Sequence, residues 1–283
     1  MTIGNEMRLS LVQMNSSPDR DANVEKALAY IDQAVDSYQS NLVVIPEFFN
    51  HPYAFSTRDH ENFKFAEPQS GYSMSRMRKK ARERKIYLIA TLFEEESAGI
   101  YYDTAFVIDP DGEVIGKYRK VMPGLYLSLE RIYFRFGSRF SVFQVGEWKV
   151  GIVICYDTFF PEHARCSAVN GAELIVVPFA APKVGPWREM MITRAWENAV
   201  YFAPCNKVGL ESGWQFGGIS MIIDPEGEVL SEAGEQQDEI INATLNRSLL
   251  FETRQKKPFF RDRRPDLYAP LCRSSEDISS TGS

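Results

Sequence analysis

Cysteine and histidine are scarce in this chain of 283 residues, which has four of the first and three of the second. The cysteines, Cys155, Cys166, Cys205 and Cys272, stand far apart, with no Cys-x-x-Cys pair and no histidine cluster nearby. This spacing supports neither a structural zinc site nor a disulfide framework. We therefore expect a protein without a metal or a cofactor.

An excess of positive charge and long apolar runs are also missing. The net charge is −6 and the pI is about 5.3, so the chain lacks the electrostatic footprint of a protein that binds nucleic acid or an anionic membrane. No apolar run reaches the length of a membrane span, and residues 1–9 lack a signal-peptide pattern. We expect a cytoplasmic protein that acts on a small molecule, with no nucleic-acid or membrane partner.

What the chain does contain is an alternation of strand and helix patterns. Short apolar runs at 8–13, 42–45, 86–92, 149–154, 174–177 and 201–206 predict strands, several of them buried on both faces. Apolar residues at helical spacing in 24–35, 74–85 and 187–200 predict helices. This alternation predicts an α/β protein.

One sequence motif occurs twice. Residues 108–114 (IDPDGEV) and 223–229 (IDPEGEV) match at six of seven positions, and each suits a turn between two antiparallel strands. The motif indicates two halves, each with a mixed sheet, and we expect the two sheets to pack together with helices outside. Turn chemistry alone could also produce the repeat.

Three reactive side chains follow predicted strands. Glu47 comes after the strand at 42–45, Lys120 after a strand at 113–118, and Cys155 after the strand at 149–154. A carboxylate could take the proton of a thiol, and an ammonium could stabilise the oxyanion that forms when sulfur attacks a carbonyl or nitrile carbon. A helix predicted to open at Pro161 would favour the thiolate.

Two plainer interpretations compete with this one. Cys155 alone could be a core residue, because free cysteine is among the most buried residue types. Histidine is the usual partner of a catalytic thiol, and a Cys155–His51 pair is the alternative arrangement; His60 and His163 are the other two histidines.

The three strand ends also carry the residues of a family resemblance. The segments 44–49 (VIPEFF), 117–120 (KYRK) and 151–157 (GIVICYD), in this order, resemble the three signatures of the nitrilase superfamily of carbon-nitrogen hydrolases. The resemblance covers roughly residues 8–270. It implies a four-layer α-β-β-α sandwich with two mixed sheets, in a protein that forms a homodimer or a higher homo-oligomer through its outer helices.

The resemblance also implies roles for individual residues. Glu47 would be the general base, Lys120 the oxyanion-stabilising cation, and Cys155 the nucleophile that forms a thioester. The backbone N–H of Tyr156 would complete the oxyanion site. Many members carry a second glutamate in a segment Glu-x-x-Tyr-Phe-x-x-Gly, which residues 130–137 match, so Glu130 would hold Lys120 and the leaving amine.

The identity of the cleaved bond is less well defined by the sequence. Residues 261–268 (RDRRPDLY) resemble those of N-carbamoyl hydrolases, but the histidine that often follows the lysine in those enzymes is replaced here by Val121-Met122-Pro123. We therefore predict a linear amide as substrate, with an N-carbamoyl compound or a nitrile as alternatives. A relative that keeps the fold as an inactive binding or scaffold protein is the alternative outside the enzymes.

Aromatic residues near the motifs are candidates for an acyl pocket. We select Phe48, Tyr156, Phe159 and Phe179 as substrate-binding residues, with Arg131 and Arg165 as possible anchors for an anionic group. We predict one hydrolase domain over residues 1–270 and a polar, disordered tail over 271–283.

Overall fold

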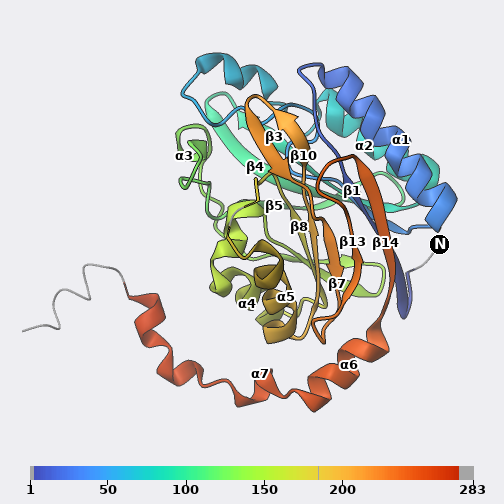
Figure 1. Ribbon diagram of the computed structural model, residues 1–283, viewed down its shortest axis with the longest axis vertical. Coiled ribbons are helices and arrows are strands. Elements are labelled where there is room, and N and C mark those ends of the chain that lie inside the picture. Colours follow the sequence, from blue (N-terminus) through green and yellow to red (C-terminus); the bar gives the residue numbers. More distant parts are fainter. Residues whose placement is uncertain (1–2, 184, 274–283) are drawn as a thin grey trace, which may run out of the picture.

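Two six-stranded mixed sheets form the centre of the protein, whose computed structural model describes residues 3–183 and 185–273 (Figure 1). The first sheet has the order β14-β1-β2-β3-β4-β5, with β1 Glu6–Gln13, β2 Leu42–Val44, β3 Tyr87–Ser97, β4 Ile100–Ile108, β5 Val114–Arg119 and β14 Glu239–Asn246. The second has the order β13-β12-β9-β8-β7-β6, with β6 Val142–Val145, β7 Trp148–Ile152, β8 Leu174–Pro178, β9 Tyr201–Cys205, β12 Met221–Ile223 and β13 Val229–Glu232.

The two sheets repeat one pattern of strands. Strands β1, β2 and β3 are parallel, as are β7, β8 and β9, and each trio continues into an antiparallel hairpin. The turns of those hairpins are the two copies of the repeated motif. In each turn the aspartate side chain accepts two backbone N–H groups, at Asp109 and at Asp224, and a glycine takes a positive φ, at Gly112 and at Gly227. The repeated sequence therefore forms the same local structure at equivalent places.

Helices cover the outer face of each sheet. Helices α1 Arg20–Tyr38 and α2 Tyr72–Arg84 lie over the first sheet, and α4 Pro161–Val169 and α5 Trp187–Asn198 lie over the second (Figure 1). Helix α1 buries Val24, Leu28 and Ile31, at helical spacing, against the first sheet. The predicted four-layer α-β-β-α arrangement is confirmed.

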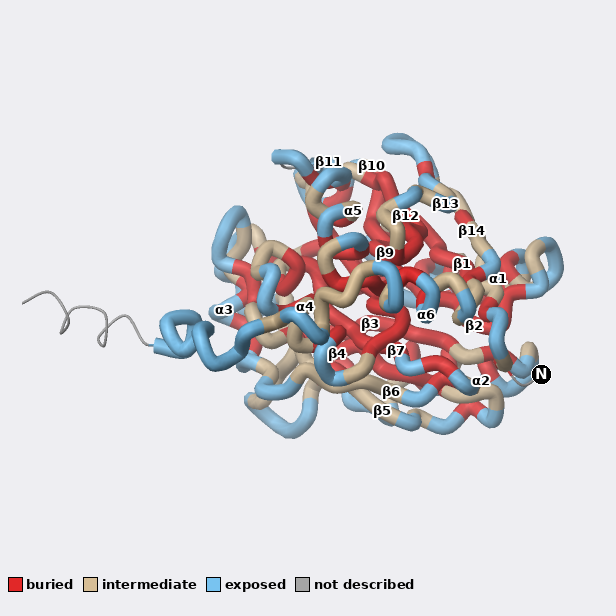
Figure 2. Tube along the Cα trace, turned by 90° about the horizontal axis from the view of Figure 1, so that it is seen from below, coloured by how far each residue is buried: buried red, intermediate tan, exposed pale blue. Residues whose placement is uncertain are grey.

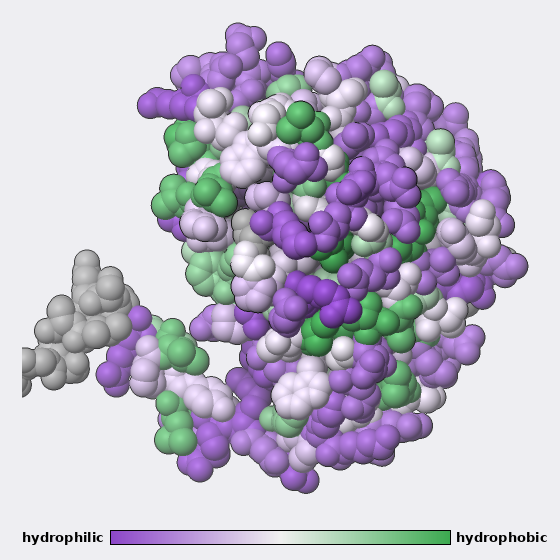
Figure 3. All heavy atoms as spheres, in the orientation of Figure 1, coloured by the Kyte–Doolittle hydropathy of each residue, from purple (hydrophilic) through white to green (hydrophobic). Residues whose placement is uncertain are grey.

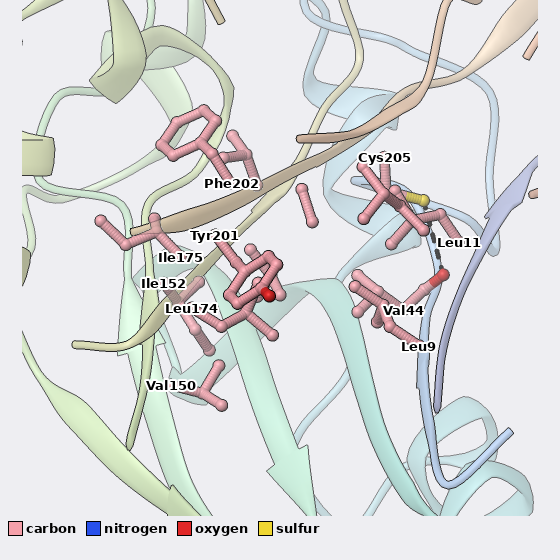
Figure 4. Close-up of a cluster of buried hydrophobic side chains, with 14 of the residues drawn as sticks. Leu9, Leu11, Val44, Val150, Ile152, Leu174, Ile175, Tyr201, Phe202 and Cys205 are labelled. Atoms are coloured by element: carbon pink, nitrogen blue, oxygen red, sulfur yellow. Dashed lines mark hydrogen bonds between the residues drawn. The ribbon is translucent and has the colours of Figure 1, made fainter. Parts of the chain in front are cut away.

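The inner faces of the two sheets form the largest apolar core. In Figure 4, Leu9, Leu11 and Val44 of the first sheet face Val150 and Leu174 of the second. These strands alternate their side chains between the inner face and the helix-covered face, so both faces are apolar. Figure 2 shows the central strands coloured as buried. Each such aliphatic side chain contributes about 1.5–3 kcal/mol to the hydrophobic stabilisation of the fold. Because these strands are packed on both faces, their ends are well supported, and Glu47, Lys120 and Cys155 follow the ends of β2, β5 and β7.

The sequence patterns did not predict the two-stranded hairpin of β10 Val208–Glu211 and β11 Trp214–Gly217. Its two turn residues, Ser212 and Gly213, both have positive φ. The remaining elements are α3 Glu130–Tyr133, α6 Arg247–Lys256, α7 Phe259–Asp262, and the 3-10 helices His60–Phe65, Cys155–Phe159, Pro265–Leu267 and Ala269–Cys272.

The C-terminal segment leaves the body of the protein after α6 and runs along its lower edge (Figure 1). Of the tail predicted to be disordered from residue 271, Leu271 and Cys272 belong to a 3-10 helix, and residues 274–283 lie outside the described part of the chain. No helix within residues 3–183 and 185–273 is long and apolar enough to cross a membrane.

Candidate active site

Two of the predicted site residues, 73 positions apart in sequence, are in direct contact. Lys120 follows β5, and its backbone N–H continues the sheet ladder by donating to the Asp103 carbonyl at 2.9 Å. Its side chain runs to the end of β2, where Nζ lies 2.7 Å from Glu47 Oε1. The strand order β2-β3-β4-β5 in the first sheet therefore places the carboxylate and the ammonium close together.

Lys120 is the centre of a buried cluster of charges. Its Nζ also lies 2.7 Å from Glu130 Oε2 and 3.2 Å from Asp103 Oδ2, and the Lys120 residue is only 1% exposed. Burial lowers the pKa of Lys120, but the surrounding carboxylates outweigh it and raise the pKa well above its usual value. Lys120 is therefore an ammonium ion at neutral pH.

Glu130 is fixed in place by three donors. Oε2 accepts the Gly124 N–H at 2.6 Å as well as Lys120 Nζ, and Oε1 accepts the Tyr53 hydroxyl at 2.9 Å. Charge-assisted hydrogen bonds of this kind are short and strong. Glu130 therefore joins Lys120, Tyr53 and the loop at Gly124 in one set of buried contacts.

Cys155 lies at a sharp bend after β7. Its φ is +44°, a left-handed value that is rare for a residue with a side chain and that marks backbone strain. Asp157 fixes the bend, because Oδ2 accepts the Ile154 N–H at 3.1 Å and the Tyr118 hydroxyl at 2.7 Å. Asp157 Oδ1 accepts the Met122 N–H at 2.8 Å, so the cysteine bend is tied to the loop that follows Lys120.

The helix predicted to open at Pro161 is present, but the surroundings of Cys155 do not favour the thiolate as expected. A 3-10 turn follows Cys155, and the regular helix starts only at Pro161. Burial raises the pKa of the Cys155 thiol well above its usual value, Glu47 adds to the rise, and Lys120 opposes it. The resting sulfur is therefore a thiol, and its activation depends on a base.

Histidine does not take part in this cluster. His51 donates its Nδ1–H to the Pro52 carbonyl (2.9 Å) and stacks on Phe65, with ring centroids 4.7 Å apart. Burial lowers the pKa of His51 to about 3, so the ring is neutral. His163 belongs to α4, and its Nδ1 lies 3.3 Å from Asp157 Oδ1. The carboxylates, rather than an imidazole, surround the reactive groups.

A hollow of about 50 Å³ opens onto Cys155 and Glu130. Its other described lining residues are small, aliphatic or aromatic: Tyr53, Gly124, Tyr126, Leu127, Ser128, Tyr156, Phe159, Ala180, Ala181, Pro182 and Trp214. Of all the lining residues that the structure describes, only Glu130 has a charged side chain. The hollow is therefore mostly apolar, with the thiol and one carboxylate at its wall.

Of the four selected substrate-binding residues, Tyr156 and Phe159 line this hollow and two do not. Phe48 is fully buried and packs on Phe55 and Phe134, and Phe179 is fully buried against Trp187, with ring centroids 4.1 Å apart. Aromatic rings near a motif serve the core as readily as a pocket.

The sequence patterns missed three residues of the site. Asp103 could have been noticed as a carboxylate in an otherwise apolar strand, and Tyr53 as an aromatic residue close after Glu47. Trp214 belongs to the hairpin that was not predicted, so nothing pointed to it.

Three carboxyl groups here have the composition of a metal site. Glu47, Asp103 and Glu130 each offer an oxygen, and these oxygens lie within 4.8 Å of one another. Lys120 Nζ contacts all three residues, so the cation that these carboxylates surround is the ammonium ion.

The fold and the cluster are those of an enzyme that hydrolyses carbon-nitrogen bonds, and comparison with known proteins agrees. Residues 8–255 match the family described as Carbon-nitrogen hydrolase. The chain is 35% identical to the omega-amidase NIT2 of Homo sapiens over 93% of its own length and 96% of that protein. It is 37% identical to a nitrilase of Pyrococcus abyssi, covering 93% of this chain and 99% of the other.

Among solved structures, a carbon-nitrogen hydrolase from Helicobacter pylori G27 superimposes with a TM-score of 0.90 and 27% identity, over 95% of this chain and 99% of the other. The protein belongs to the carbon-nitrogen hydrolase family of the nitrilase superfamily and acts on carbon-nitrogen bonds other than peptide bonds. The predicted family and class of enzyme are confirmed.

Proposed function

We propose that the protein hydrolyses a linear amide through a thioester on Cys155, with Glu47 as general base, Lys120 as oxyanion-stabilising cation and Glu130 as the residue that holds Lys120. One observation carries this proposal. An ammonium ion lies 2.7 Å from each of two buried carboxylates, beside a strained cysteine that opens onto a hollow.

The first half-reaction forms the thioester. The Cys155 sulfur attacks the carbonyl carbon while its proton passes to Glu47, and the carbonyl oxygen becomes an oxyanion. The Lys120 ammonium and the Tyr156 backbone N–H stabilise that oxyanion. The carbon-nitrogen bond then breaks, and Glu47 returns the proton to the nitrogen, which leaves as ammonia or an amine.

The second half-reaction releases the acid. A water molecule gives a proton to Glu47 and attacks the thioester carbon, so that a second oxyanion forms beside Lys120. The carbon-sulfur bond breaks, and the sulfur recovers a proton from Glu47. A carboxylic acid leaves, and the resting thiol is restored.

The lining of the hollow favours an uncharged, apolar acyl group. A substrate carboxylate would lie near Glu130, and none of the described residues that line the hollow is a cation that could pair with it; an unpaired buried charge is costly. Neither candidate anchor lines the hollow; Arg131 donates to the Pro123 carbonyl and Arg165 to the Glu197 carbonyl. N-carbamoyl amines and nitriles remain the alternative substrates.

A substrate panel tests this proposal. We expect ammonia release from short uncharged carboxamides with a kcat/KM at least about 10-fold above that for an amide bearing a carboxylate, for N-carbamoyl amines and for nitriles. The Cys155→Ala variant should lose turnover by about 10³-fold or more, and intact mass of the wild type with a slow amide should show one acyl adduct that Cys155→Ala lacks. Wild-type rates in Cys155→Ala would exclude the thioester route.

We also propose that residues 1–270 act as one hydrolase domain and that two chains pair through their outer helices. Exposed apolar side chains on α4 and α5, Val169 and Trp196, support that pairing. A reducing, cytoplasmic setting would suit four cysteines that are all free thiols.

A further inference from the structure

Asp103 is a buried carboxyl group at the heart of the site that the proposed chemistry does not use. It lies on β4, is 1% exposed, and its side chain reaches the same ammonium that contacts Glu47 and Glu130. The residue opposite it on β3, Phe93, is apolar. The charged and titratable groups around Asp103 are therefore Glu47, Lys120, Glu130 and, beyond them, Cys155.

The charges of the cluster do not balance if every carboxyl group is ionised. Three carboxylates and one ammonium would leave two buried negative charges, with oxygens within 4.8 Å of one another. Like charges at this range, shielded from water, drive one group to keep its proton. The cluster therefore needs at least one neutral carboxyl group.

The contacts indicate which group that is. Glu130 receives three donors, and Glu47 receives Lys120 Nζ at 2.7 Å, whereas Asp103 has only the longer contact of 3.2 Å. Burial raises the pKa of Asp103 well above its usual value; Lys120 opposes this, and Glu47 adds to it. Asp103 is the least stabilised as an anion.

The unpaired oxygens give the position of the proton. As carboxylates, Glu47 and Asp103 would leave Glu47 Oε2 and Asp103 Oδ1 without a hydrogen-bond donor, and Asp103 Oδ2 with only the 3.2 Å ionic contact to Lys120 Nζ, although all three oxygens are buried. The two side chains lie within hydrogen-bond reach of each other. A proton on Asp103 turns that contact into a short, strong O–H···O⁻ bond and satisfies Glu47 Oε2.

We propose that Asp103 is a positioning residue that holds a proton: as a neutral carboxylic acid it donates to Glu47, and so keeps the general base ionised and aimed at the Cys155 thiol. This inference rests on the proposed function, because it assigns Glu47 the role of base. Asp103 itself exchanges no proton with the substrate. Because Asp103 is neutral, it does not compete with Glu47, Glu130 and the oxyanion for the positive charge of Lys120.

Two substitutions separate the hydrogen bond from the charge. Asp103→Asn keeps the shape and a donor but cannot ionise, so we expect kcat within about threefold of the wild type and an unchanged acid limb of the kcat/KM–pH profile. Asp103→Leu removes the donor, so we expect kcat to fall by about 10²-fold and the acid limb to move to higher pH by about one unit. An Asn variant as inactive as the Leu variant would overturn the proposal, as would a Leu variant with an unmoved acid limb.

A spectroscopic measurement tests the proton without any turnover. The infrared spectrum of the wild type should contain a protonated-carboxyl band at neutral pH that shifts with ¹³C-aspartate labelling, does not shift with ¹³C-glutamate labelling, and is absent from Asp103→Asn. A band that follows the glutamate label would place the proton on another residue and overturn the proposal. The band needs no substrate, so it can be present even if Cys155→Ala keeps the wild-type rate and the thioester route is excluded. Failure of the proposed function and failure of this inference are therefore distinguishable.

Discussion

The Cys155 sulfur and the carboxyl groups behind it show how burial sets the chemistry of this site. Burial raises the pKa of the thiol and of Asp103, while the same burial leaves Lys120 charged because carboxylates surround it. Each group therefore has its protonation state fixed by its neighbours rather than by solvent. The site thus combines a thiol, an ammonium and buried carboxyl groups, the set of groups that the proposed mechanism uses.

A raised carboxyl pKa has a consequence for stability. Asp103 binds its proton more tightly in the folded protein than in the unfolded chain, so its contribution to the free energy of unfolding falls as pH rises from about 4 towards its folded-state pKa. Asparagine has no such dependence. We predict that Asp103→Asn becomes more stable than the wild type as pH increases through this range, and that the difference shrinks towards pH 4.

Urea unfolding at several pH values measures this difference. The control is Asp111→Asn in the β4–β5 turn, where the side chain is 81% exposed and the difference from the wild type should not grow with pH in the same way. A flat profile for Asp103→Asn would contradict the raised pKa.

At the scale of elements, the β10–β11 hairpin is joined to the loop after β2 by a second buried ion pair. Lys207 Nζ lies 2.7 Å from Glu211 Oε2 and also donates to the Ser16 hydroxyl and the His51 carbonyl. Glu211 in turn accepts the backbone N–H groups of Ser16 and Tyr53. Since Tyr53 donates to Glu130, this pair links the hairpin to the site.

We predict that breaking this pair from either side destabilises the protein strongly. Lys207→Met or Glu211→Gln alone should lower the free energy of unfolding by about 3–5 kcal/mol, because each leaves a buried partner without its counter-ion. The double variant should lose clearly less than the sum of the two. Both single variants should also lower kcat/KM, since each disturbs the Glu211 side chain, which accepts the Tyr53 N–H.

A double-mutant cycle by urea unfolding measures the coupling. The exposed pair Lys183–Glu235 has the same 2.7 Å separation with both side chains more than half exposed, and Lys183→Met with Glu235→Gln should give a coupling of only about 0–1 kcal/mol. Equal coupling in the two pairs would show that burial of Lys207 and Glu211 is unimportant.

Local patterns in the sequence predicted most of these elements, because strand periodicity and turn chemistry are short-range properties. The two aspartate-glycine hairpins are correct for this reason. The β10–β11 hairpin was missed because residues 208–217 contain two internal glycines and few β-branched residues, although Ser212-Gly213 is a turn signal.

At the scale of the whole molecule, the site depends on contacts that no local pattern contains. The motifs indicated that Glu47, Lys120 and Cys155 each follow a strand, and the resemblance brought them together. The contact of Asp103 with Lys120 follows from the pairing of β4 with β5. The contact of Tyr53 with Glu130 joins the loop after β2 to the start of α3, 77 residues away. Phe48 and Phe179 were selected as substrate-binding residues but do not line the hollow, because side-chain direction at a strand end depends on tertiary packing.

The helices over the second sheet, α4 and α5, have exposed apolar side chains on their outer face. Val169 on α4 is 47% exposed and Trp196 on α5 is 46% exposed, and Leu267 and Leu271 are exposed on the C-terminal segment beyond α6. Figure 3 shows hydrophobic residues on the part of that segment that leaves the body of the protein. A two-fold pairing that brings the same face of two chains together would cover this apolar surface. We predict that the wild type sediments as a dimer or a larger homo-oligomer at micromolar concentration.

Sedimentation velocity on the full chain checks this prediction. Val169→Asp places a charge on the proposed interface and should shift the protein towards the monomer, because an unpaired charge is costly to desolvate. Leu210→Asp is the matched control, because Leu210 is 69% exposed on the β10–β11 hairpin and lies outside the outer helices. The pairing through the helices would be ruled out if the wild type sedimented as a monomer, or if only Leu210→Asp dissociated the assembly.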